Sequence, residues 1–77
     1  MVVSPRKPVN IVFTNHAKKR MKKKHILEEE AIATIHYPET TKKIEGKYYA
    51  QKHIGRGKIE VVFEKETYIK VITLYWI

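Results

Sequence analysis

His16 and Arg20 stand four residues apart in the segment FTNHAKKRM, residues 13–21. Thr14 is a good helix cap, and side chains four residues apart on a helix lie on the same face. An imidazole accepts or donates a proton near neutral pH, and a planar guanidinium matches the oxygens of a phosphate. The pair therefore predicts a site that holds a phosphate group and moves a proton.

Two further groups of side chains offer related chemistry. Thr73 and Tyr75 alternate along a β-rich segment, so their hydroxyl groups share one face of a strand. Basic side chains that suit RNA or phosphate binding are Lys18, Lys19, Lys23, Lys52, His53 and Arg56. A purely structural interpretation stays open, because His16 can simply bond the sheet edge and Thr and Tyr are common strand residues.

The charge of the chain is strongly one-sided. Sixteen Lys and Arg oppose eight acidic residues, which gives a formal net charge of +8, and residues 1–25 contain no acid. Such a field attracts polyanions, so RNA or an acidic protein is the expected partner, although charge runs also serve solubility.

Several classes of protein are disfavoured. The 77 residues form one small domain and contain no cysteine, no apolar run of membrane-spanning length and no secretory signal pattern. We therefore expect a cytoplasmic protein without membrane contact. The chain has no aspartate and no paired His and Glu at metal-ligand spacing, so we expect no metal site and no cofactor.

The predicted elements follow from caps, turns and periodicity. We expect an extended arm over residues 1–8, a short edge strand over 9–13, a helix from Thr14 to about Lys24 and a second helix over about 28–36. Strands are expected over 40–44, 47–54, 58–64 and 67–77. The edge strand at 40–44 offers a surface for pairing with a second copy, so a homodimer is open.

The predicted hairpins create a conflict about the two sheet faces. A two-residue turn at Lys65-Glu66 places Phe63 opposite Tyr68, and a three-residue loop at 55–57 places Lys52 opposite Glu60. These registers put Thr73 and Tyr75 on the face away from the helices. His16 must then approach from the sheet edge, or one register is wrong.

The segment from Thr14 to Met21 resembles the "[ST]-x-H-A-x-x-R-M" opening of a small domain-of-unknown-function family grouped with the RelE/ParE toxin superfamily. The segment VITLY, residues 71–75, is similar to that family's closing "V-x-T-x-Y" strand. The resemblance implies two N-terminal helices packed on a four-stranded antiparallel sheet, an α+β fold of the barnase–EndoU–colicin–RelE type, over residues 9–77. It also implies a glycine near His25, which this sequence lacks.

The same resemblance implies a metal-independent endoribonuclease that acts as the toxin of a toxin–antitoxin pair. RNA, including ribosome-bound mRNA, is then the substrate and an acidic antitoxin the protein partner. His16, Arg20, Thr73 and Tyr75 are the expected catalytic residues. The alternatives are a non-catalytic nucleic-acid-binding module and an acidic-protein-binding module of the same fold.

Overall fold

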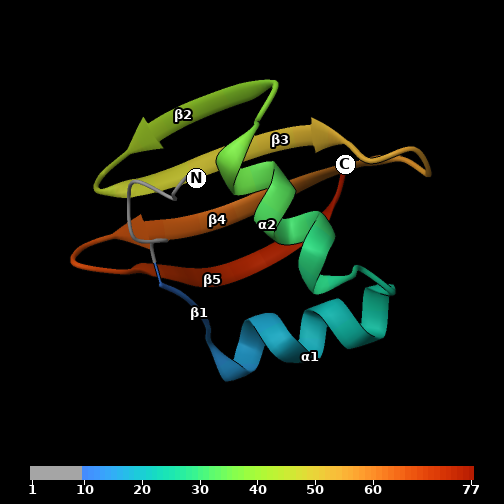
Figure 1. Ribbon diagram of the computed structural model, residues 1–77, viewed down its shortest axis with the longest axis horizontal. Coiled ribbons are helices and arrows are strands. Elements are labelled where there is room, and N and C mark those ends of the chain that lie inside the picture. Colours follow the sequence, from blue (N-terminus) through green and yellow to red (C-terminus); the bar gives the residue numbers. More distant parts are fainter. Residues whose placement is uncertain (1–9) are drawn as a thin grey trace, which may run out of the picture.

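The computed structural model describes residues 10–77, which form a five-stranded mixed sheet with two helices (Figure 1). The elements in chain order are β1 (Ile11–Phe13), α1 (Asn15–Lys24), α2 (Glu28–His36), β2 (Thr40–Ile44), β3 (Lys47–His53), β4 (Lys58–Lys65) and β5 (Ile69–Trp76). The order of strands across the sheet is β1-β5-β4-β3-β2. The predicted arm at residues 1–8 lies outside the described residues.

The predicted four-stranded antiparallel sheet is wrong. β1 forms a fifth strand that runs parallel to β5, with Ile11 opposite Ile69 and Phe13 opposite Val71. The other neighbouring strands pair antiparallel. Turn signals predict pairing only between strands that follow each other in sequence. It could not place a three-residue strand whose partner lies near the other end of the chain.

Helix α1 begins at the predicted cap, which also fastens the helix to β5. The Thr14 Oγ1 atom accepts a hydrogen bond from the Ala17 N–H at 3.1 Å and donates one to the Ile72 carbonyl at 3.1 Å. The Thr14 N–H donates to the carbonyl of Val71 at 3.1 Å. Because three bonds meet at one residue, the start of α1 is fixed against the middle of β5.

The turn between the helices confirms the predicted break. His25 ends α1 in the left-handed conformation, with φ 59° and ψ 44°, and its N–H donates to the Met21 carbonyl. Glycine adopts this conformation without steric cost, which explains the glycine implied by the resemblance. The next helix begins without a side-chain cap at Leu27, whose N–H donates instead to the Glu30 carboxylate at 2.9 Å.

Both predicted hairpin registers are wrong, by one residue for β3–β4 and by three residues for β4–β5, where Phe63 lies opposite Val71 instead of Tyr68. Residues 54–57 form the β3–β4 loop, so Lys52 lies opposite Ile59. Residues 66–68 form the β4–β5 loop, and a bulge between Val62 and Phe63 shifts the register again, which places Ile59 opposite Trp76. Each loop is one residue longer than predicted, and the β4–β5 loop also begins one residue later, at Glu66, which together account for the shifted pairings.

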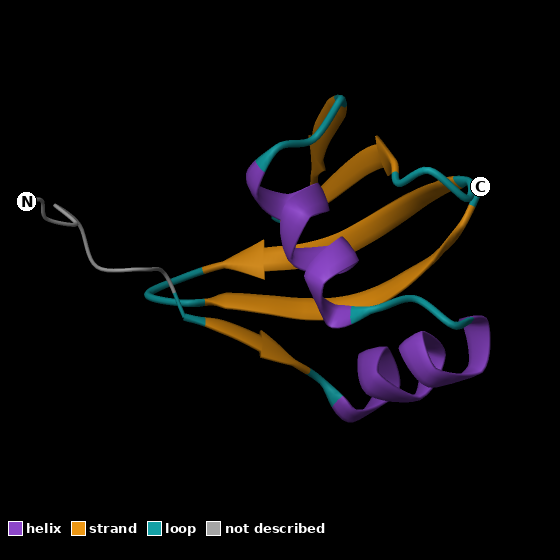
Figure 2. Ribbon diagram, turned by 45° about the vertical axis from the view of Figure 1, so that its right-hand side comes forward, coloured by secondary structure: helices purple, strands orange, loops and turns teal. Residues whose placement is uncertain are grey.

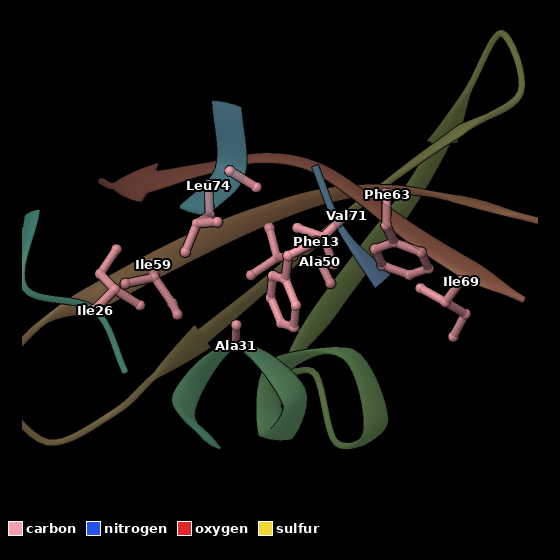
Figure 3. Close-up of a cluster of buried hydrophobic side chains, with 11 residues drawn as sticks. Phe13, Ile26, Ala31, Ala50, Ile59, Phe63, Ile69, Val71 and Leu74 are labelled. Atoms are coloured by element: carbon pink, nitrogen blue, oxygen red, sulfur yellow. The ribbon is translucent and has the colours of Figure 1, made fainter. Parts of the chain in front are cut away.

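The bulge gives the sheet one apolar face. It places both Val71 and Leu74, which strict alternation would separate, on the face that α2 covers. Figure 3 shows most of this core between the sheet and α2. Its buried members are Phe13, Ala17, Ile26, Ala31, Ala50, Ile59, Val61, Phe63, Ile69, Val71 and Leu74.

Helix α2 crosses the sheet over β3 and β4, whereas α1 lies along the free part of β5 (Figures 1 and 2). In the part of the chain that the structure describes, no helix is long and apolar enough to cross a membrane.

Candidate active site

His16 and Thr73 meet where α1 begins beside β5. The His16 Nε2 atom lies 3.2 Å from the Thr73 Oγ1 atom, and which of the two donates depends on the imidazole tautomer. β1 ends at Phe13, so the following stretch of β5 has no strand on the β1 side, and α1 takes that place. His16 therefore approaches from the sheet edge, which resolves the conflict between its helix and the face of Thr73.

Thr73 shares the sheet face away from α2 with Tyr75. Thr73 pairs with Val62 and Tyr75 pairs with Glu60, and directly opposed residues point to the same side of a sheet. We call this side the open face: Tyr49, Gln51, Glu60, Val62, Thr73 and Tyr75. The site that His16 approaches is therefore an open surface and not a closed cleft.

The hydroxyl group of Tyr75 acts as a hydrogen-bond donor in the fold. Its hydroxyl donates a hydrogen bond to the Glu60 Oε1 atom at 3.1 Å. Burial, followed by the neighbouring Glu60 carboxylate, raises the pKa of Tyr75 above its ordinary value. The phenol therefore stays protonated at neutral pH, which is the state that a general acid needs.

Arg20 follows His16 by one helical turn and contributes an unusual donor. Its Nε atom is buried and has no hydrogen-bond partner among the described residues. A buried N–H without an acceptor is costly and rare in folded proteins. The Nε–H is thus an unpaired donor one helical turn from His16, and a phosphate oxygen can reach it only after the Arg20 side chain moves.

A family model described as "Domain of unknown function (DUF4258)" matches residues 13–76. The chain belongs to this family. The comparisons with curated proteins and with solved structures found no match. The predicted domain-of-unknown-function family is confirmed, and these comparisons show no link to the RelE/ParE superfamily.

Glu60 is the residue of this DUF4258 chain that sequence reasoning missed. The alternation of β4 already places Glu60 on the face of Thr73 and Tyr75, but the predicted register paired it with Lys52. The observed register pairs it with Tyr75 and, on the other side, with Gln51. The correct length of the β4–β5 loop, together with the bulge in β4, would have placed Glu60 opposite Tyr75 and so identified Glu60 as its partner.

Lys52 and His53 do not join His16. They lie on β3, which β4 separates from β5. The Lys52 Nζ atom donates to the Tyr37 carbonyl at 3.0 Å, and the His53 Nδ1 atom lies 3.4 Å from the Glu39 Oε1 atom. Both side chains bind the segment that follows α2.

Arg56 is likewise engaged within the fold of this DUF4258 domain. Its Nη2 atom donates to the Glu30 carboxylate at 2.6 Å and to the His25 carbonyl at 3.1 Å. Its guanidinium lies 5.3 Å from the ring centre of Trp76. Phosphate binding by Arg56 stays a prediction, but its contacts already give it a structural role.

The predicted lysines of α1 are all exposed. Lys18 and Arg56 border an open hollow of about 540 Å³, with Met21, Ile26 and Leu27 among its apolar lining. This hollow lies between the end of α1 and the start of α2, so it is separate from the His16–Thr73 contact. Among residues 10–77, no three His, Asp or Glu side chains gather where they could hold a metal ion.

Proposed function

We propose that this chain is a RelE-like toxin, a metal-independent endoribonuclease whose site contains His16, Arg20, Thr73 and Tyr75. One observation carries the proposal. The contact between His16 and Thr73 joins residues 57 apart in sequence, and Tyr75 lies two residues from Thr73 on the same face of β5. A proton acceptor, a proton donor and a free guanidinium donor are the groups that this reaction requires.

The proposed reaction uses the RNA's own 2′-hydroxyl as nucleophile. His16 takes the hydroxyl proton, the 2′-oxygen bonds to the neighbouring phosphorus, and the bond to the 5′-oxygen breaks. Tyr75 gives its proton to that leaving oxygen. After the products leave, the proton that His16 took passes to water and a proton from water returns to the Tyr75 oxygen, which restores both groups. Arg20 binds the phosphate while its charge develops, and Thr73 orients the imidazole. The products are a 2′,3′-cyclic phosphate and a 5′-hydroxyl.

The charge of the molecule supports the proposed partners. A net charge of +8, concentrated in the acid-free segment up to His25, favours a polyanion such as RNA as substrate, and we include mRNA on the ribosome in this class. It equally favours an acidic antitoxin as the protein that blocks the site.

The test is incubation of the purified chain with end-labelled RNA in the presence of a metal chelator. We expect fragments with 2′,3′-cyclic phosphate ends. His16→Ala and Arg20→Ala should each lower the cleavage rate by about 100-fold, the scale of a lost proton-transfer or charge-stabilising group. His36→Ala, an exposed histidine at the end of α2, is the matched control and should cleave like the parent.

A non-catalytic nucleic-acid-binding module is the second candidate. It is favoured by the fact that His16 and Tyr75 already have partners within the fold. Salt-sensitive RNA binding without any cleavage product would establish this function and reject the endoribonuclease. Unchanged cleavage by His16→Ala would instead reject the proposed mechanism.

A further inference from the structure

The two adjacent tyrosines of β3 point to opposite sides of the sheet. Tyr48 packs on the core side, where its ring stacks on Phe63 with centroids 5.2 Å apart and planes 11° from parallel. Tyr49 pairs with Val62 and therefore lies on the open face. Of this pair, only Tyr49 is placed to contact a ligand on that face.

Tyr49 and Tyr75 flank a small apolar centre. Val62 is only 4% exposed, yet it does not belong to the core beneath α2. Its neighbours on the open face must therefore shield it. Tyr49 also lies close enough to Tyr75 to contribute to the raised pKa of that residue. The two rings thus form one partly apolar surface beside the His16–Thr73 contact.

On the open face, a negative charge lies near the centre and positive charges lie at the margins. Glu60 lies in the middle of the face, where a carboxylate repels phosphate groups and accepts hydrogen bonds from N–H donors. Lys42 of β2 pairs with Tyr49 at one margin. Lys47 and Lys70 lie at the next row, 3.9 Å and 3.7 Å from the carboxylate of Glu64. The pattern favours bases at the centre and phosphates at the rim.

We propose that the open face binds an unpaired segment of RNA, whose bases stack on Tyr49 and Tyr75 while its backbone follows the lysine margins toward His16. Aromatic side chains hold bases that are free of a duplex, because paired bases are already stacked inside the helix. The substrate class is therefore single-stranded RNA. This inference rests on the proposed function only in taking RNA as the ligand.

The test is fluorescence anisotropy with a labelled 2′-O-methyl RNA, which the proposed mechanism cannot cut. The same sequence is offered single-stranded and as a duplex at one salt concentration. We expect the single strand to bind at least about tenfold more tightly. Tyr49→Leu, which still covers Val62 but lacks an aromatic ring, should weaken single-strand binding about tenfold, and Tyr49→Phe should restore it.

Tyr37→Ala is the matched control, since this tyrosine is 72% exposed and lies at the end of α2. Its effect on binding should stay within about twofold. Equal affinity for duplex and single strand would overturn the inference, as would equal affinities of Tyr49→Leu and the parent. Selective binding without cleavage of unmodified RNA would reject the endoribonuclease and leave the single-strand surface standing.

Discussion

The hydroxyl of Thr73 is the group on β5 that links the strand to α1 at the candidate site. It contacts the His16 imidazole, whereas the Thr73 backbone belongs to the β4–β5 pairing. The side chain can therefore be changed without changing the strand. A buried or half-buried hydroxyl beside an imidazole fixes its orientation, which is a condition for efficient proton transfer.

Replacing Thr73 by valine separates this role from packing. Thr73→Val keeps the branched shape that suits a strand but removes the oxygen. We expect RNA cleavage to fall by about tenfold while the free energy of unfolding changes by less than about 1 kcal/mol. Cleavage assays and urea denaturation measure the two effects. Thr41→Val on the exposed β2 is the control, and equal cleavage by both variants would contradict the assigned role.

At the scale of elements, the start of α1 depends on Thr14. This residue caps the helix and also bonds β5, so it sets the distance between the His16 helix and the Thr73 strand. Caps were among the signals that sequence reasoning used correctly. The second bond, to the Ile72 carbonyl, could not be predicted because it depends on the parallel placement of β1 beside β5.

Thr14→Ala should lower the free energy of unfolding by about 1–2 kcal/mol, the usual cost of a lost N-cap. Thr14→Ser retains a hydroxyl that can cap the helix and should retain most of the stability. Urea denaturation followed by circular dichroism measures both. A stability loss as large in Thr14→Ser as in Thr14→Ala would show that the methyl group, and not the hydroxyl, is what matters.

The turn at His25 gives a prediction of the opposite sign. A residue with a side chain at φ 59° carries a steric cost that glycine avoids. We expect His25→Gly to raise the free energy of unfolding by up to about 1 kcal/mol. His25→Ala keeps the Cβ atom and should give no such gain. Thermal or urea unfolding of the parent and the two variants measures these changes. A lower stability of His25→Gly than of the parent would contradict the prediction.

At the scale of the whole molecule, Arg56 joins parts that are distant in sequence. Its guanidinium bonds Glu30 at the start of α2 and lies over Trp76 at the end of β5. The Trp76 indole N–H in turn donates to the Lys24 carbonyl at 2.9 Å. This network connects both helices, the β3–β4 loop and the last strand.

The network makes stability depend on pH. The hydrogen bond from Arg56 is the largest cause that lowers the pKa of Glu30, and burial opposes it. A lowered pKa stabilises the folded chain above the ordinary carboxyl range, and that contribution is lost as the pH falls through the lowered pKa. Glu30→Gln should cost about 1 kcal/mol near pH 7 and much less near pH 3.

Urea denaturation at the two pH values measures this difference. Glu29→Gln, at an exposed position of the same helical turn, should show no comparable change. A stability loss for Glu30→Gln that is the same at both pH values would contradict the assigned ion pair.

The sequence predicted local features better than relations between elements. Both helices and the existence of all five strands follow from caps, charge patterns and alternation. The parallel pairing of β1, the loop lengths and the bulge beside Val62 were not predictable, because each depends on which apolar residues the sheet must bury together. The His16–Thr73 contact depends on all of these features. The sequence alone therefore could not decide whether α1 and β5 bring the two residues together.

The parallel pairing of β1 with β5 has a consequence for how the protein is made. A ribosome releases residues from the N-terminus onward, so β1 and His16 emerge before the strand that they need. Until Ile69–Val71 have been added, β1 has no partner, and until Thr73 has followed, the imidazole has none. The candidate site is thus completed by the last strand of the domain. A chain still being translated cannot carry it, and synthesis of this domain must finish before it can act.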